Sequence, residues 1–137
     1  MKSKRIKTPR KRLEEFNKIL DYLNSLNYPV VVEGKRDTLA LRNLGYNGNI
    51  VELNDGSSVL STVEFLAQKL GVSGNFVIMT DWDRTGGRLA KQLKEYGESS
   101  DLQPDLTIRR NLELLCSKDI SCIEELPTMV RILQNQL

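Results

Sequence analysis

The stretch VVVEGKRD, residues 30–37, indicates the fold more directly than any other part of the sequence. Three consecutive valines are typical of a strand that is buried on both faces of a sheet. The run ends on the carboxylate of Glu33. After one glycine, the basic pair Lys35 and Arg36 leads into a helix that we expect to end at Leu44, because Gly45 follows. The segment therefore predicts a buried strand, a polar turn and a helix in direct succession.

A second stretch, TDWDRTGG at residues 80–87, has the same organisation. It follows the apolar run 76–80, which predicts another buried strand. Asp81 and Asp83 lie one residue apart where this strand ends, so both carboxylates can turn toward one point. We interpret residues 82–87 as a loop. Its two glycines allow a close backbone approach or a positive φ.

In the rest of the chain, apolar residues occur either in short continuous runs, which are typical of buried strands, or at steps of three and four residues, which are typical of helices. The expected strands cover residues 29–33, 49–53, 76–80 and 105–109. The expected helices cover residues 9–26, 36–44, 59–70, 88–96, 112–116 and 127–137. Strands that alternate with helices predict an α/β fold with a mainly parallel sheet of about four strands, flanked by helices.

The strand ends of such a sheet predict a functional site. Ligands of parallel sheets bind beyond the carboxyl ends of the strands. Glu33 follows the first expected strand, Asn54 and Ser57 follow the second, and Asp81 and Asp83 follow the third. We expect Asn54 and Ser57 to bind substrate phosphate or a water molecule beside the metal. Three acids at one edge repel one another unless a cation is present, and oxygen ligands suit Mg²⁺, with Mn²⁺ as a substitute. We therefore expect Glu33, Asp81 and Asp83 to be the metal-binding and catalytic residues.

Each motif also has a purely structural interpretation. An aspartate followed by a glycine turn can be an ordinary helix cap, and the charges after the first strand can be a solvated cluster. For substrate phosphate we select three cations and two glycines, because free N–H groups at a helix start can receive an anion. These candidates are Lys35, Arg36, Arg84, Gly86 and Gly87. The indole of Trp82 either stacks on a base or ribose or packs on its own loop.

Composition excludes several chemistries. The 137 residues include no histidine, so histidine-based catalysis and serine or cysteine triads with histidine are excluded. Two cysteines without histidine do not form an ordinary zinc site. No stretch approaches eighteen apolar residues and no apolar segment follows the basic N-terminus, so we expect neither a transmembrane helix nor a secretory signal. We expect a cytoplasmic protein that does not bind membranes.

Charge is distributed unevenly along the chain. Residues 1–12 contain seven basic residues and no acid, whereas residues 13–137 contain 13 basic and 18 acidic residues. We therefore divide the chain into a basic, flexible arm over residues 1–12 and a single α/β domain over residues 13–137, with an N-terminal helix and a C-terminal helical segment. Such an arm either contacts the phosphates of a nucleic acid or is a solvated tail.

The two motifs together resemble the signature motifs of the Toprim family, the catalytic domain shared by topoisomerases, bacterial primases and some nucleases. The resemblance covers residues 28–112 and implies a compact, Rossmann-like Toprim fold. It implies that Glu33 is a general acid/base or metal-associated group and that Asp81 and Asp83 bind Mg²⁺. Gly34 and Asp37 match accessory positions. Trp82 departs from the small residue or proline that the family commonly has there.

Within the family, the sequence looks most similar to small stand-alone archaeal and bacterial Toprim proteins. The bacterial ribonuclease that matures 5S ribosomal RNA has a similar segment to residues 33–37. Its Asn-Gly-Ser turn resembles residues 54–57 with one residue inserted. The chain lacks the additional domains with which topoisomerases and primases act, so strand passage and priming by this chain alone are not expected.

Three functions follow as hypotheses. The leading one is an Mg²⁺-dependent, nuclease-like enzyme acting on nucleic acid, with RNA favoured over DNA. The alternative is a non-catalytic module that binds RNA or a ribonucleoprotein partner. The third is a phosphatase of the haloacid dehalogenase type, which residues 81–86 resemble. That motif belongs after the first strand of its fold, whereas two strands precede it here, and it does not explain Glu33. The sequence predicts no oligomeric state.

Overall fold

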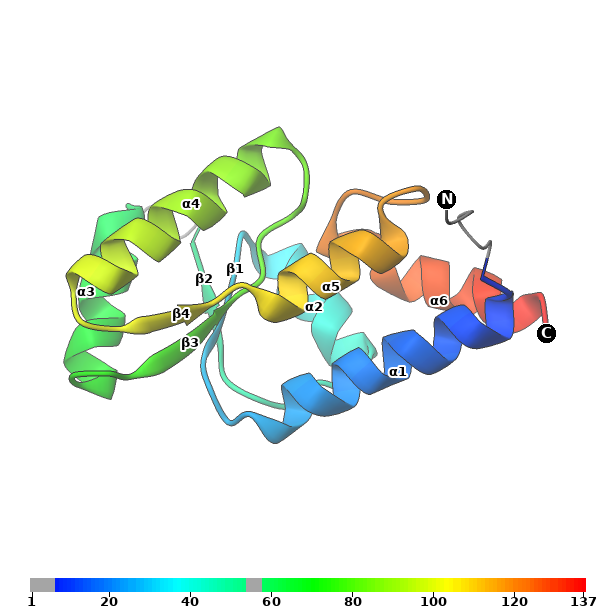
Figure 1. Cartoon of the computed structure of the whole chain (residues 1–137), viewed down its shortest axis with the longest axis horizontal. Coiled ribbons are helices and arrows are strands. Elements are labelled where there is room, and N and C mark those ends of the chain that lie inside the picture. Colours follow the sequence, from blue (N-terminus) through cyan, green and yellow to red (C-terminus); the bar gives the residue numbers. More distant parts are fainter. Residues whose placement is uncertain (1–6, 54–57) are drawn as a thin grey trace, which may run out of the picture.

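The computed structural model describes residues 7–53 and 58–137, which form a three-layer α/β arrangement (Figure 1). A parallel sheet has the strand order β2-β1-β3-β4. Its strands are β1 (Val30–Val32), β2 (Ile50–Glu52), β3 (Asn75–Ile78) and β4 (Gln103–Asp105). The helices are α1 (Pro9–Ser25), α2 (Lys35–Asn43), α3 (Val59–Leu70), α4 (Arg84–Ser99), α5 (Thr107–Cys116) and α6 (Leu126–Asn135), and a short 3-10 helix, η1 (Ile123–Glu125), precedes α6. The predicted fold class and parallel sheet are confirmed.

The valine run of β1 is buried because helices cover both faces of the sheet. Val30 and Val32 belong to a core cluster with residues of α1, α2, α5 and α6. Val31 points the other way and packs with residues of α3 and α4. None of the three valines is exposed to solvent. A strand with no solvent-facing side has no polar alternation, which is why its sequence is a continuous apolar run.

The order of the strands places a cleft between β1 and β3. β1 leads into α2 on one face of the sheet, whereas β3 leads into α4 on the other face. The two connections leave in opposite directions from neighbouring parallel strands. Beyond the carboxyl ends of such a pair, α/β sheets bind their ligands. Glu33, which follows β1, and the segment that follows β3 therefore lie beside this cleft.

Three elements differ from their predicted bounds by more than two residues at one end or both. Helix α4 begins at Arg84 instead of residue 88, because the side chain of Asp83 caps it there, and it runs to Ser99 instead of residue 96. Strand β4 covers Gln103–Asp105 instead of residues 105–109. Helix α5 begins early, at Thr107, whose N–H donates to Asp105 Oδ1 at 2.7 Å and turns the chain away from the sheet. A proline fits in β4 because this strand lies at an edge of the sheet.

The N-terminal helix is part of the folded body. Residues 9–12, which we assigned to the basic arm, form the first turn of α1. The guanidinium of Arg12 donates to Leu115 O at 3.2 Å and pairs with Asp119. Residues 1–6 of the arm lie outside the described residues. Within the described ranges, no helix is long and apolar enough to cross a membrane.

Packing of α1 against the sheet gives a stability prediction. Phe16 on α1 is 3% exposed and lies in the cluster that covers Val30 and Val32. Phe16→Ala should lower the free energy of unfolding by about 3–5 kcal/mol, because it removes a buried ring and leaves a cavity. Tyr22→Ala, at a half-exposed position of the same helix, is the control and should change it by roughly 1 kcal/mol or less. Urea unfolding measures both, and equal effects would show that α1 is not part of the core.

Candidate metal and catalytic site

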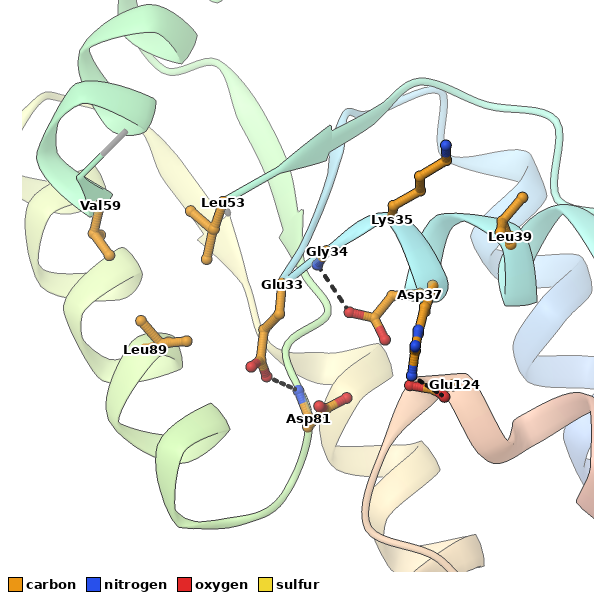
Figure 2. A pocket seen from close by; sticks show the side chains of 11 residues that line it. Glu33, Gly34, Lys35, Asp37, Leu39, Leu53, Val59, Asp81, Leu89 and Glu124 are labelled. Carbon is orange, nitrogen blue, oxygen red and sulfur yellow. Dashed lines mark hydrogen bonds and ion pairs between the residues drawn. The ribbon is translucent and has the colours of Figure 1, made fainter. Parts of the chain in front are cut away.

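Glu33 and Asp81 meet at the carboxyl ends of the adjacent strands β1 and β3. The backbone N–H of Asp81 donates to Glu33 Oε2 at 2.8 Å. Figure 2 shows the Glu33 side chain directed from the end of β1 toward the backbone of Asp81. This bond fixes one oxygen of Glu33 and leaves the other facing the cleft.

The carboxylate of Asp81 is held by a different part of the chain. Its Oδ1 accepts from the backbone N–H of Ile123, in η1, at 2.9 Å. The nearby Asp37 is buried on α2, where its Oδ2 accepts from Gly34 N–H at 3.0 Å (Figure 2). Each of these acids therefore has one oxygen oriented by a backbone amide. Gly34 and Asp37, which we predicted as accessory residues, form the helix cap that follows Glu33.

Asp83 differs from these acids because it is exposed and caps a helix. Its Oδ1 accepts from Gly86 N–H at 2.7 Å, and its backbone carbonyl accepts from Gly87 N–H at 2.9 Å. The amides of Gly86 and Gly87 are thus already bonded to Asp83, so in this conformation these two N–H groups are not free to receive an anion. The capping interpretation of the Asp83 motif is confirmed, and the second oxygen of Asp83 remains available to a ligand.

Burial and mutual repulsion shift the acids toward their protonated forms. Burial raises the pKa of Glu33 to about 7; the Asp81 amide opposes this, and repulsion from Asp81, Asp83 and Asp37 adds to it. Burial, with repulsion from Asp81, raises the pKa of Asp37 to about 6. Burial also raises the pKa of Asp81, against the bond from Ile123. A cation placed among these groups would relieve both the burial and the repulsion of their charged forms.

The donor set fits a magnesium ion that keeps most of its own water. Across the described residues, no three His, Cys, Asp or Glu side chains are arranged to hold a metal by themselves. Mg²⁺ does not require such a set, since it usually takes one or two carboxylates together with water and substrate phosphate. Glu33 and Asp81, whose charges repel each other, and the nearby Asp83 are the side chains that would hold it.

A cavity of about 790 Å³ adjoins the two acids. Lys35 and Arg36, at the start of α2, contribute its basic lining. Arg36 Nη1 lies 3.6 Å from Glu124 Oε1, and its side chain is 82% exposed, so this ion pair is weak and a phosphate can replace it. Of the predicted phosphate-binding residues, these two line the cavity, whereas Arg84, Gly86 and Gly87 do not. Asn54 and Ser57 lie outside the described residues.

Trp82 packs within the protein. Its Nε1–H donates to Ile120 O at 2.8 Å, and its backbone N–H donates to Ser121 O at 3.0 Å. The ring is packed against the core cluster that contains α1 and α6. Of the two roles considered for this residue, packing is therefore confirmed and base stacking is not. Through these two hydrogen bonds, Trp82 connects the segment after α5 to the loop that carries Asp81.

Two site residues were not predicted from the sequence. Arg109, on α5, donates through Nε to Thr80 O at 3.0 Å and through Nη2 to Asp81 O at 2.7 Å. Glu124, in η1, lines the cavity beside Arg36. Both are more than 20 residues from the motifs along the chain, so no local spacing could indicate them.

A match to the Toprim domain covers residues 29–111, more than half of the chain. The chain belongs to the Toprim family. Toprim domains are generally associated with metal-dependent enzymes of nucleic acids and typically bind Mg²⁺. In this Toprim protein, Glu33, Asp81 and Asp83 lie within the matched range, whereas the Ile120–Glu124 segment lies outside it.

The relatives of this Toprim protein resemble it over most of their length. A UPF0292 protein of Methanosarcina barkeri is 40% identical over 124 residues, which cover 88% of this chain and 84% of that protein. A UPF0292 protein of Pyrococcus abyssi is 36% identical over 111 residues, 81% of this chain and 80% of that one. A solved structure from Aquifex aeolicus has a TM-score of 0.67 at 25% identity and covers 80% of this chain and 96% of that chain. The similarity to the 5S-rRNA-maturing ribonuclease stays a prediction.

The two glycines of the second motif should respond oppositely to substitution. A Cβ on Gly86 would lie 1.8 Å from Asp81 O, whereas a Cβ on Gly87 would meet only Arg109 Nη2, at 4.0 Å. Gly86→Ala should destabilise the protein by about 3 kcal/mol or more, since backbone must move. Gly87→Ala should be neutral or stabilise it by up to about 1 kcal/mol, because alanine favours a helix. Thermal unfolding measures both, and a tolerated Gly86→Ala would contradict the close approach.

The raised pKa of Glu33 predicts how stability depends on pH. The pKa of Glu33 in the folded protein is about 7, whereas an unperturbed glutamate has a pKa of 4.5. The proton on Glu33 therefore stabilises the folded protein at low pH, and this stabilisation is lost as the pH rises from about 4.5 to about 7. In EDTA, the free energy of unfolding should fall between about pH 5 and about pH 8, by roughly 1–3 kcal/mol.

Glu33→Gln should reduce this fall, because glutamine still accepts the Asp81 N–H but carries no charge. Part of the fall should remain, since the raised pKa of Asp37 acts with the same sign. Glu64→Gln, at an exposed position of α3, is the matched control and should keep the wild-type profile. A Glu33→Gln profile identical to that of the wild type would show that Glu33 ionises normally in the folded protein.

Proposed function

We propose that this Toprim protein carries out Mg²⁺-dependent phosphodiester chemistry on nucleic acid, with a nuclease-like reaction and with RNA favoured over DNA. The observation that carries the proposal is the Glu33–Asp81 pair, joined by a 2.8 Å hydrogen bond at the carboxyl ends of β1 and β3. Lys35 and Arg36 line the same cavity and supply positive charge for a phosphate. The family's association with metal-dependent enzymes of nucleic acids agrees with this arrangement.

The three acids have different proposed roles, in metal binding and in proton transfer. Asp81 and Asp83, together with Glu33, would hold Mg²⁺ or Mn²⁺. When bound, the metal supplies charge stabilisation for the scissile phosphate. We assign Glu33 the role of general acid or base; in the metal-free protein, burial and the neighbouring acids raise its pKa to about 7, so it binds a proton more readily than an ordinary glutamate. Arg36 can exchange its weak contact with Glu124 for a phosphate oxygen.

Arg84 is exposed at the first residue of α4 and remains a candidate contact for a phosphate outside the cavity. Asn54 and Ser57 remain proposed substrate contacts on sequence grounds. The preference for RNA rests on the resemblance of residues 33–37 to the 5S-rRNA-maturing ribonuclease, whereas the basic N-terminal residues favour nucleic acid in general. A ribonucleoprotein is the corresponding candidate partner.

Cleavage assays on single-stranded RNA, single-stranded DNA and an RNA hairpin, each with an internal label, test the proposal. Products should appear with Mg²⁺ or Mn²⁺ and not with EDTA. Glu33→Gln, Asp81→Asn and Asp83→Asn should each lower the cleavage rate by about 100-fold or more. Each substitution keeps an oxygen acceptor for the backbone bond of the native acid, so circular dichroism should show an unchanged fold.

Asp101→Asn provides the matched control. Asp101 is exposed and has a φ of 62°, a conformation that asparagine tolerates well. The variant should cleave at the wild-type rate. RNA binding without cleavage, unaffected by Asp81→Asn, would overturn the catalytic proposal and match a non-catalytic RNA-binding module. Accumulation of an aspartyl phosphate on Asp81 would indicate a phosphatase instead.

A further inference from the structure

The cavity beside Glu33 has an apolar wall that phosphodiester chemistry does not require. Leu53 follows β2, Val59 is the first residue of α3, and Leu89 lies on α4; all three line the cavity. Figure 2 shows these side chains gathered on the side of Glu33 that faces away from Lys35 and Asp37. Leu53 belongs to the core cluster between the sheet, α3 and α4, and Val59 and Leu89 are partly buried side chains that pack against this cluster.

The cavity is therefore divided into two chemically different halves. One half is lined by Glu33 and Asp81 together with Lys35 and Arg36. The other half is aliphatic, with Leu53 buried and Val59 and Leu89 half-buried. A site for phosphate and metal alone has no need of apolar surface, which is unfavourable to leave in contact with water. Small-molecule sites combine mostly apolar walls with a few placed polar groups in this way.

A nucleotide matches both halves. Its phosphate is recognised by cations and metal, and the flat face of its base is apolar enough to lie against aliphatic side chains. In a duplex, however, both faces of a base are covered by its stacked neighbours. A base can therefore reach a wall inside a cavity only when it has left the stack or belongs to a single strand.

We propose that Leu53, Val59 and Leu89 form a subsite for one unstacked nucleobase, whose phosphate lies at Glu33 and Asp81. The inference rests on the proposed function and narrows its substrate class to single-stranded or locally unpaired nucleic acid. Lys35 and Arg36 contact the phosphate from the side opposite the wall. The subsite favours ligands that carry a base over ligands that carry none, but it distinguishes poorly between different bases, because an aliphatic wall offers no hydrogen-bond partners.

Titration of the full-length protein with two probes tests the subsite. Adenosine 5′-monophosphate carries both phosphate and base, whereas ribose 5-phosphate carries the phosphate and sugar without the base. In Mg²⁺, isothermal titration calorimetry should show tighter binding of the nucleotide by roughly tenfold, which is in the range of one base contact. Equal affinities for the two probes, or no binding of the nucleotide, would overturn the inference.

Substitutions locate the base contact. Leu89→Asn should reduce the affinity for adenosine 5′-monophosphate by about tenfold and that for ribose 5-phosphate by less than about twofold. Leu60→Asn, at a half-exposed position of α3 outside the cavity lining, should change neither affinity. Because Leu89 is half-buried, Leu89→Ala provides a milder variant, and it should weaken nucleotide binding in the same selective way. A loss shared equally by both probes in both variants would contradict a base subsite.

Cleavage and binding measurements on the wild-type protein and the Leu89 variants distinguish a failure of this inference from a failure of the proposed function. Metal-dependent cleavage with equal affinity for the two probes would refute the subsite and leave the catalytic proposal standing. A tenfold base preference that Leu89→Asn removes, in a protein that cleaves none of the substrates, would refute the catalytic proposal and support the subsite. Preferential cleavage of single-stranded over fully paired RNA would support both, whereas a preference for fully paired RNA would count against the subsite.

Discussion

The hydrogen bond from Asp81 N–H to the carboxylate of Glu33 connects the sheet to the site. It requires β1 and β3 to be parallel neighbours, in the register that pairs Val31 with Ile78. With that register, the residue after β1 lies over the backbone that leaves β3. The bond uses one oxygen of Glu33 and the main chain of Asp81, so the Asp81 side chain is left to accept a bond from Ile123. The two carboxylates are thereby held close together, and neither of them forms an ion pair with a cationic side chain in the described structure; Arg109 bonds only the backbone carbonyl of Asp81.

This arrangement is electrostatically unfavourable in the absence of a cation. Burial and neighbouring charge raise the pKa values of Glu33, Asp37 and Asp81 together. Acids selected only for stability would be solvated or paired with a base, and clustered shifts of this kind are typical of functional sites. The backbone amides of Gly34, Asp81 and Ile123 offset part of the cost. A divalent cation would offset more of it, and this links the stability of the fold to the proposed chemistry.

The residues beyond the Toprim match complete both the core and the site. Helices α1 and α6 cover the face of the sheet that carries Val30 and Val32. The segment before α6 binds the Asp81 loop through Ile120 O, Ser121 O and Ile123 N. Glu124, from the same segment, lines the cavity. The C-terminal part of the chain therefore orients Asp81 directly, in addition to stabilising the domain.

How much could be predicted from the sequence depends on the range of the interaction involved. The valine run, the helical periodicities and the acids at strand ends are local patterns, so they determined the α/β class and placed Glu33 and Asp81 at one edge of a parallel sheet. The roles of Trp82, Arg109 and Glu124 depend on packing between segments far apart in the chain, and only the tertiary structure decided them. Gly86 shows the same limit in part: the sequence predicted a loop in which this glycine allows a close backbone approach or a positive φ, and the fold places it in a helix, where the close approach to the backbone of Asp81 is present. Hydrophobic periodicity indicates which face of a helix or strand is buried, but it does not indicate which other segments of the chain pack against that face.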